Sequence, residues 1–334
     1  MRLLKVTKID DALKLIKDSF SPLETEEVTL EKAGGRYCAE EIIASEDVPA
    51  FNRSTVDGYA VRAEETFGAT ANFPSFLELA GIGQMGEEAG NIGSGQCFYV
   101  PTGGMLPLGA DAVVMVEETE EVEGLVQVFK QVAPGENVIR RGEDLSCGQV
   151  VLGRGRKIRG PELGLLGSLG ITRFKVYRRP LVGILSTGDE LTPVETPSLK
   201  PGQIRDANGV ALFYLCRQAG AEAVNGGIIP DQYDAFAQRI KSLLAQVDMV
   251  VLSGGSSVGT RDYTPAVLQE LSGGELLLEG LAVKPGKPTI LARCDNKPVL
   301  GLPGHPVSAL NIFSLLGQAL INRLSGAAEE EWRP

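Results

Sequence analysis

The chain has 334 residues, enough for two or three domains at roughly 100–200 residues each. Hydrophobic residues make up 43% of it, so a substantial core can form, and the net charge of −11 argues against the basic surface that nucleic acids and membranes require. The five cysteines are scattered without a CxxC pair, which indicates free thiols. We see neither a signal peptide nor an apolar run near the ~20 residues of a membrane span, and we expect a cytoplasmic protein.

The first part of the chain predicts a mixture of elements. Helical spacing of apolar residues favours a helix over 10–20, which Ser21-Pro22 ends. Residues 26–43 look like a strand followed by a helix, which we expect over 30–43. The polar segment 47–60 is either a loop that joins domains or a binding loop, because binding residues favour loops on a scaffold.

The next region is β-like. Short apolar runs between 73 and 138 are separated by glycine-rich or acidic turns, without a long helix. The acidic stretch 117–123 suits a solvated hairpin. Leucines at helical spacing then predict a helix over 161–169, with Pro161 near its start.

From residue 178 onward, strands and helices alternate, which implies a mostly parallel sheet. Asn208 and Asp231 are candidate N-caps. The expected strands are 181–185, 223–229, 249–252, 289–292 and 299–302. The expected helices are 209–218, 233–246, 265–271 and 307–324.

The apolar run that opens this region stops in Ser186-Thr187-Gly188-Asp189-Glu190. In α/β sheets, ligands bind at such carboxyl ends of strands. Three further polar loops, 206–208, 253–259 and 301–306, follow later strands or precede helices. We expect these loops to converge on one site that binds phosphate and metal.

The residue types in these loops suggest the chemistry. Small side chains over 253–259 let backbone N–H groups approach a phosphate, although no P-loop lysine follows. Glu190, Asp206 and Asp262 each follow a strand end and together suit Mg²⁺. The alternative is that each acid caps a helix or turn. His305 fills space in its loop more readily than it acts as a general base, because no triad partner is evident.

Two lysines and a serine suit an oxyanion. Lys284 and Lys287 lie about one turn apart on the stiff segment 284–288, and Ser308 begins a predicted helix. Its hydroxyl and the free N–H groups of that helix start are placed to bind the same anion.

Seven motifs together resemble the molybdopterin molybdenumtransferases, MoeA and the gephyrin E domain. They cover nearly the whole chain in the family's order. They are PAFNRSTVDGYAVR (Pro49–Arg62), PTGG…GADAVVMVEE (Pro101–Glu118), GENVIRRGED (Gly135–Asp144), VGILSTGDEL (Val182–Leu191), SGGSSVGTRDY (Ser253–Tyr263), KPGKP (Lys284–Pro288) and GLPGHPVSA (Gly301–Ala309).

The resemblance implies an α/β multidomain fold. It comprises a discontinuous, elongated helical linker domain (1–45 and 141–177), a β-rich insert domain (46–140), a three-layer, MogA-like α/β domain with a mostly parallel sheet (178–326) and a tail (327–334). The family usually continues into a small C-terminal β-barrel, which we expect to be absent here.

The resemblance also implies the reaction. Adenylylated molybdopterin and molybdate are the substrates, AMP is released, and molybdenum is left on the dithiolene. We expect a homodimer, with an active site between the α/β domain of one subunit and the β-rich domain of the other. A molybdopterin adenylyltransferase is a possible partner. One alternative is a non-catalytic molybdopterin- or molybdate-binding carrier. Another is an adenylyltransferase.

By motif, the resemblance assigns three groups of residues. The catalytic group is Asp57, Thr102, Asp144, Glu190, Lys284 and Lys287, of which the two lysines contact molybdate together with Ser308. The Mg²⁺ ligands are Glu190, Asp206 and Asp262. The residues that bind the molybdopterin substrate are Ser186, Thr187, Gly188, Asp206, Asn208, Ser253, Gly254, Gly255, Ser257, Gly259, Pro288, Pro303, Gly304 and Ser308.

Overall fold

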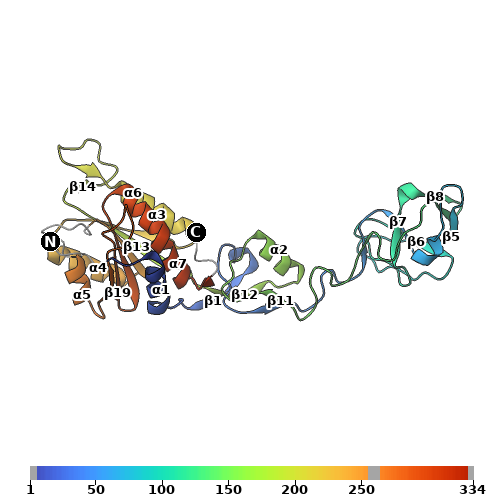
Figure 1. The fold of residues 1–334 in the computed structure, drawn as a ribbon, viewed down its shortest axis with the longest axis horizontal. Helices are drawn as coiled ribbons and strands as arrows, with labels where there is room; N and C mark the ends of the chain where they lie inside the picture. Colours follow the sequence, from blue (N-terminus) through green and yellow to red (C-terminus); the bar gives the residue numbers. More distant parts are fainter. Residues whose placement is uncertain (1–5, 255–263, 330–334) are drawn as a thin grey trace. The chain divides into compact units, whose positions relative to one another are not determined.

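The computed structural model describes residues 6–254 and 264–329 (Figure 1). The chain forms two compact units. The first comprises Met1–Glu41, Leu152–Gly164 and Ile171–Pro334, and the second comprises Ile42–Val151 and Leu165–Gly170.

A six-stranded sheet organises the first unit, in the order β16-β13-β17-β20-β19-β18. The first four strands are parallel, whereas β19 runs antiparallel to both of its neighbours, β20 and β18. This confirms the predicted α/β class. The strands are β13 (Leu181–Thr187), β16 (Glu222–Ile229), β17 (Met249–Ser253), β18 (Glu275–Glu279), β19 (Ile290–Cys294) and β20 (Lys297–Leu302).

Each face of this sheet has its own core. Along β17, Met249 and Val251 join one core while Val250 and Leu252 join the other, as a two-residue period requires. Helices cover both faces, with α3 and α6 on one and α4 and α5 on the other (Figure 1). The helices are α1 (Ile9–Ser19), α3 (Ala207–Gln218), α4 (Tyr233–Leu244), α5 (Thr264–Glu270), α6 (Pro306–Ile312), the π-helical turn η4 (Phe313–Gly317) and α7 (Gln318–Leu324).

The segment α6-η4-α7 forms one apolar helix of 19 residues, Pro306–Leu324. By length and composition alone it meets the requirement for crossing a membrane, a test that core helices also pass. Ile312, Phe313, Leu316 and Leu320 are fully buried in the core that α1 and α3 share. This packing favours a core helix.

Two local predictions are wrong. Residues 30–43 form no α-helix beyond the short 3₁₀ turn η1 (Leu30–Lys32). Gly35 has φ +76°, and backbone N–H groups of Gly35 and Cys38 donate to carbonyls of Ile158 and Arg156 instead of to a helix. The N-caps are Asp206 for α3 and Gln232 for α4, in place of Asn208 and Asp231.

Short elements complete the first unit. Strands β1 (Thr25–Thr29) and β12 (Arg173–Tyr177) pair antiparallel. Strands β14 (Leu191–Thr192) and β15 (Ile204–Arg205) pair parallel and close the segment between β13 and α3. Helix α2 (Gly160–Ser168) contains residues of both units.

The second unit is built on a mixed sheet in the order β7-β4-β6-β5-β9-β8. Tyr59 and Val61 pack in one core and Ala60 in a second, so both faces of β4 are covered. The region is β-rich, as predicted, and β8 and β9 form the acidic hairpin. The strands are β4 (Gly58–Val61), β5 (Ser75–Ile82), β6 (Gln96–Val100), β7 (Ala112–Met115), β8 (Thr119–Val122) and β9 (Leu125–Val128).

The remaining elements of the second unit are short. Strand β3 (Arg53–Ser54) pairs with β10 (Val138–Ile139), and β2 (Ile42–Ile43) pairs with β11 (Val150–Leu152). Two 3₁₀ turns, η2 (Ala63–Thr66) and η3 (Val116–Glu118), follow β4 and β7.

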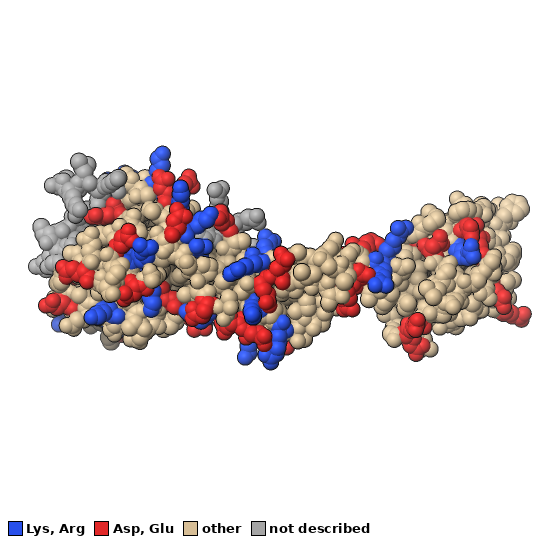
Figure 2. Space-filling view, turned by 90° about the horizontal axis from the view of Figure 1, so that it is seen from below, with Lys and Arg blue, Asp and Glu red and all other residues tan. Residues whose placement is uncertain are grey.

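Charged side chains of both signs are interspersed over the face of the molecule drawn in Figure 2. This face carries no continuous basic surface in its described part. The five cysteines are free thiols, as predicted.

Candidate functional site

Asn208 joins three of the predicted loops. Its side chain is buried at the first turn of α3, and its Nδ2 donates to Ser253 Oγ (2.9 Å) and to the Gly304 carbonyl (2.8 Å). Ser253 ends β17, and Gly304 follows β20. The structure therefore brings together the carboxyl ends of two parallel strands and the start of a helix, as α/β sheets do at their ligand sites.

The end of β13 lies against the same group. Gly254 has φ +92°, and a Cβ there would lie 2.4 Å from the Thr187 carbonyl oxygen, so only glycine fits. The hydroxyls of Ser186 and Thr187 are buried without a hydrogen-bond partner in the described part of the chain. Unpaired buried hydroxyls cost free energy, and a ligand that bonds to them would remove that cost.

The carboxylates Glu190 and Asp206 flank the β14–β15 pair. Asp206 Oδ1 accepts a bond from Gly209 N at 2.9 Å and so caps α3. Glu190 folds back over Gly188, where a Cβ would lie 2.7 Å from Glu190 Oε2. Asp262 lies outside the described residues, and within 6–254 and 264–329 no three acidic, histidine or cysteine side chains cluster as metal ligands.

The segment 284–288, which we call the lysine segment, packs on α6, the helix that carries Ser308. A Cβ on Gly286 would meet Ile312 Cδ1 at 2.4 Å, and Ser308 and Ile312 are one turn apart on α6. Lys284 and Lys287 flank Gly286 and are exposed, whereas Ser308 and Pro303 are buried. Pro288 lies at the end of this segment and is half-buried.

In the second unit the structure brings Asp57 and Thr102 together, because Thr102 N donates to Asp57 Oδ1 at 2.7 Å. Asp144 lies near the same segment, with its Oδ2 4.0 Å from a guanidinium nitrogen of Arg53. Three predicted substrate contacts in the first unit, Gly255, Ser257 and Gly259, lie outside the described residues.

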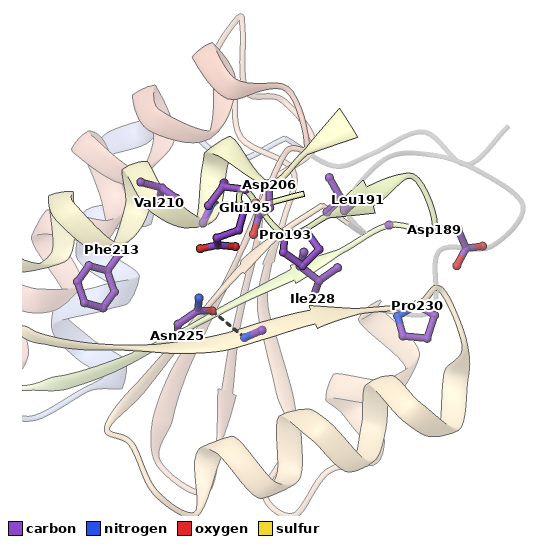
Figure 3. A pocket seen from close by; sticks show the side chains of 14 residues that line it. Asp189, Leu191, Pro193, Glu195, Asp206, Val210, Phe213, Asn225, Ile228 and Pro230 are labelled. Carbon is purple, nitrogen blue, oxygen red and sulfur yellow. Dashed lines mark hydrogen bonds between the residues drawn. The ribbon is translucent and has the colours of Figure 1, made fainter. Parts of the chain in front are cut away.

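Beside Gly188 and Asp206 lies a pocket of about 800 Å³ that sequence reasoning missed (Figure 3). Figure 3 shows Phe213 on α3 and Asn225 on β16, with Glu195 between these elements. The one sequence signal for it was the Asn225-Gly226-Gly227 run, because glycines inside a strand mark a bulge. Its walls are Gly188, Asp189, Leu191, Pro193, Val194, Glu195, Asp206, Gly209, Val210, Phe213, Asn225, Gly227, Ile228 and Pro230.

Known proteins resemble this chain over almost its full length. Residues 7–170 match the family described as MoeA N-terminal region (domain I and II), and residues 183–323 match a probable molybdopterin binding domain. Molybdopterin molybdenumtransferase of Haemophilus influenzae is 38% identical over 96% of this chain and 77% of its own. The chain belongs to the molybdopterin molybdenumtransferase (MoeA) family.

Other members of the MoeA family agree. Molybdopterin molybdenumtransferase of Bacillus subtilis is 34% identical over 94% of this chain and 74% of its own. The crystal structure of the molybdopterin biosynthesis moeA protein from Pyrococcus horikoshii OT3 superimposes with a TM-score of 0.80 at 31% identity, over 97% of this chain and 81% of that one. The relatives carry transferase names, so the non-catalytic alternative finds no support in them.

Proposed function

We propose that the chain inserts molybdenum into adenylylated molybdopterin during molybdenum cofactor biosynthesis, with release of AMP. Water breaks the bond between the two phosphates, which leaves one phosphate on molybdopterin and releases AMP. The two dithiolene thiols replace two oxo groups of molybdate. These oxygens leave as water with the thiol protons and two protons from solvent, and molybdenum stays in its hexavalent state.

The observation that carries this proposal is the pair of hydrogen bonds from Asn208 to Ser253 and Gly304. They hold three loops at one end of the sheet, beside the unpaired hydroxyls of Ser186 and Thr187. Loops with small side chains and free N–H groups bind phosphate well. We assign this end of the sheet to the phosphates of the substrate.

The lysine segment supplies the second half of the site. Lys284 and Lys287 are exposed cations near the helix that carries Ser308, an arrangement that suits molybdate. Positive charge held beside the dithiolene would keep molybdate oriented for attack by the thiols. We propose Ser308 as a neutral donor to the same anion.

The acids of these loops fit Mg²⁺ by their chemistry, since carboxylates are hard oxygen ligands. Glu190 directly precedes β14 and Asp206 directly follows β15, the strand that pairs with β14. Bound there, Mg²⁺ would offset charge on the phosphates. Asp262 completes the proposed set of ligands. The remaining proposed contacts are Gly188, Gly254, Gly255, Ser257, Gly259, Pro288 and Pro303.

We also propose the wider assembly. A homodimer would join the α/β domain (178–326) of one subunit to Asp57, Thr102 and Asp144 in the β-rich domain (46–140) of the other. Residues 1–45 and 141–177 would form the elongated linker domain. The family resemblance supports this, and it supports a cytoplasmic enzyme that receives substrate from a molybdopterin adenylyltransferase.

The deciding experiment measures AMP. The purified chain is incubated with adenylylated molybdopterin, with and without molybdate and Mg²⁺, and released AMP is quantified. We expect release to require both additions and to stop when a chelator removes Mg²⁺. The proposal would be overturned if the chain binds the substrate but releases no AMP even when molybdate and Mg²⁺ are both present.

A variant tests the acids. Glu190→Gln keeps the shape of the side chain but removes its charge, so we expect AMP release to fall by at least roughly a hundredfold while the unfolding midpoint is unchanged. Glu222→Gln, an exposed glutamate at the start of β16, is the matched control. Equal rates for Glu190→Gln and the control would remove Glu190 from the mechanism.

A further inference from the structure

The pocket beside the loops has a composition that suits a particular kind of ligand. Most of its lining side chains are apolar, and its volume of about 800 Å³ lies within the usual range of small-molecule sites. Its polar side chains are the carboxylates of Asp189, Glu195 and Asp206 and the amide of Asn225. Among the described residues that line it, none is lysine, arginine or histidine.

This composition disfavours the anionic groups of a ligand and favours an uncharged ring. The Glu195 carboxylate, in a lining with no lysine, arginine or histidine among its described residues, would repel a phosphate or a molybdate. It would instead accept a hydrogen bond from an N–H group of the ligand, while Phe213 and Ile228 offer apolar surface. A flat, uncharged heteroaromatic ring with an amino group meets both requirements.

The walls are held in place by contacts outside the pocket. The Arg205 guanidinium donates to the Thr196 and Pro197 carbonyls, which fixes the segment that carries Glu195. The Glu195 carboxylate itself makes no hydrogen bond or ion pair within the described part of the chain, so its oxygens are available to a ligand.

The opposite wall is fixed by a bulge. Strand β16 shifts register against β13 between Ile184 and Leu185, and Arg239 donates to the Gly226 carbonyl at 2.9 and 2.6 Å. Asn225 Oδ1 accepts from Gly227 N at 2.8 Å (Figure 3), which orients its Nδ2 group as a remaining donor. Bulges are common next to binding sites, where they redirect side chains.

We propose that this pocket binds an amino-substituted heteroaromatic ring of the substrate. The inference rests on the proposed function, because Gly188 and Asp206 belong both to the pocket wall and to the proposed phosphate site. A ligand with its phosphates at the loops places a ring in the pocket. Adenylylated molybdopterin carries two such rings, the adenine and the pterin, which share this chemistry.

Binding measurements with two probes identify the ring. Calorimetric titration of the full chain uses AMP in one arm and 6-hydroxymethylpterin in the other. We expect Phe213→Ala and Glu195→Gln each to weaken binding of one probe roughly tenfold, through lost stacking and a lost charge-assisted hydrogen bond. The matched controls are Tyr214→Ala, the exposed neighbour of Phe213 on α3, and Glu222→Gln; both lie outside the pocket.

Each result has one meaning. Weakened AMP binding assigns the pocket to adenine, and weakened pterin binding assigns it to the pterin. If both pocket variants bind both probes as the wild type does, or if neither probe binds the wild type, the inference is wrong. AMP release by the wild type tests the proposed function separately. If the wild type releases AMP but the pocket variants bind both probes normally, only the assignment of the pocket is refuted. If the pocket variants lose probe binding but the wild type releases no AMP, only the proposed reaction is refuted.

Discussion

At the scale of single residues, we propose that Asn208 positions the loops of the candidate site. Motif resemblance assigns it to the substrate, yet both bonds from its Nδ2 go to the protein, to Ser253 and Gly304. A buried amide with such partners fixes the distance between the loops. We therefore propose Asn208 as a positioning residue, which acts through Ser253 and the Gly304 loop.

Replacing Asn208 tests this role. Asn208→Ala leaves a buried hydroxyl and a carbonyl without their donor, so we expect the free energy of unfolding to fall by roughly 1–3 kcal/mol. Once the loops can move apart, kcat for AMP release should fall more than KM changes, since orientation is lost before contact is lost. The measurements are denaturant unfolding and steady-state kinetics.

Asn72→Ala, an exposed asparagine in the second unit, serves as control and should change neither quantity. A variant Asn208→Ala that loses stability but keeps wild-type kcat and KM would show that the residue is only structural.

At the scale of secondary structure, periodicity predicted most of what positions the site. Short apolar runs such as β17, alternating along the chain with helical segments, predicted the mostly parallel sheet. Strand β18 was missed because Glu275–Glu279 is a leucine run without β-branched residues. The helix expected over 30–43 failed because long-range backbone bonds to Arg156 and Ile158 replace the local ones.

The loops and the pocket differ in how far they could be predicted. The loops follow strands, and the carboxyl ends of parallel strands meet at one edge, so their convergence follows from topology. The pocket depends on how the segment 189–206 folds over β16, and no local pattern encodes that contact. Glu195 and Phe213 are unremarkable in the sequence for this reason.

An ion pair between Arg178 and Asp248 lies at the amino ends of β13 and β17, away from the loops of the site, and its contribution to stability can be measured. Asp248 Oδ2 and Oδ1 accept bonds of 2.7 and 2.8 Å from Arg178, and Oδ2 also accepts from Leu181 N at the start of β13. Burial alone would raise the pKa of Asp248, but the hydrogen bonds from Arg178 and Leu181 outweigh it and hold the pKa below its usual 3.8.

Asp248→Asn should lower the free energy of unfolding at neutral pH by roughly 1–3 kcal/mol, as expected for hydrogen bonds to a charged group. Because the folded pKa is depressed, the stabilisation is present above the unfolded pKa and is lost as pH falls through the folded one. The difference between wild type and variant should therefore shrink below about pH 4.

Chemical denaturation between acidic and neutral pH measures this difference. Asp18→Asn, an exposed aspartate of α1, should change stability by less than roughly 0.5 kcal/mol. If the difference in unfolding free energy between the wild type and Asp248→Asn stayed constant through the acidic range, the proposed stabilisation by the ion pair would be wrong.

At the scale of the whole molecule, the proposed homodimer predicts complementation between variants. Asp57→Asn and Glu190→Gln would each inactivate a different half of a site shared by two subunits. Mixed dimers contain one site with both halves intact, so random mixing of equal amounts should restore roughly a quarter of wild-type AMP release.

The experiment unfolds, mixes and refolds the two variants, with each variant refolded alone as control. Sedimentation measures the dimer fraction in every sample. Dimers that form without any recovery of activity would show that Asp57 and Glu190 do not serve one site across subunits.

The bulge of β16 also protects the molecule. Strand β16 ends the sheet, and an unpaired strand at that position is a template on which other chains can add and aggregate. Here Arg239 already occupies the Gly226 carbonyl and Asn225 occupies the Gly227 N–H. The edge therefore offers an incoming strand an interrupted row of partners, and the same irregularity that shapes the pocket should keep the enzyme soluble at high concentration.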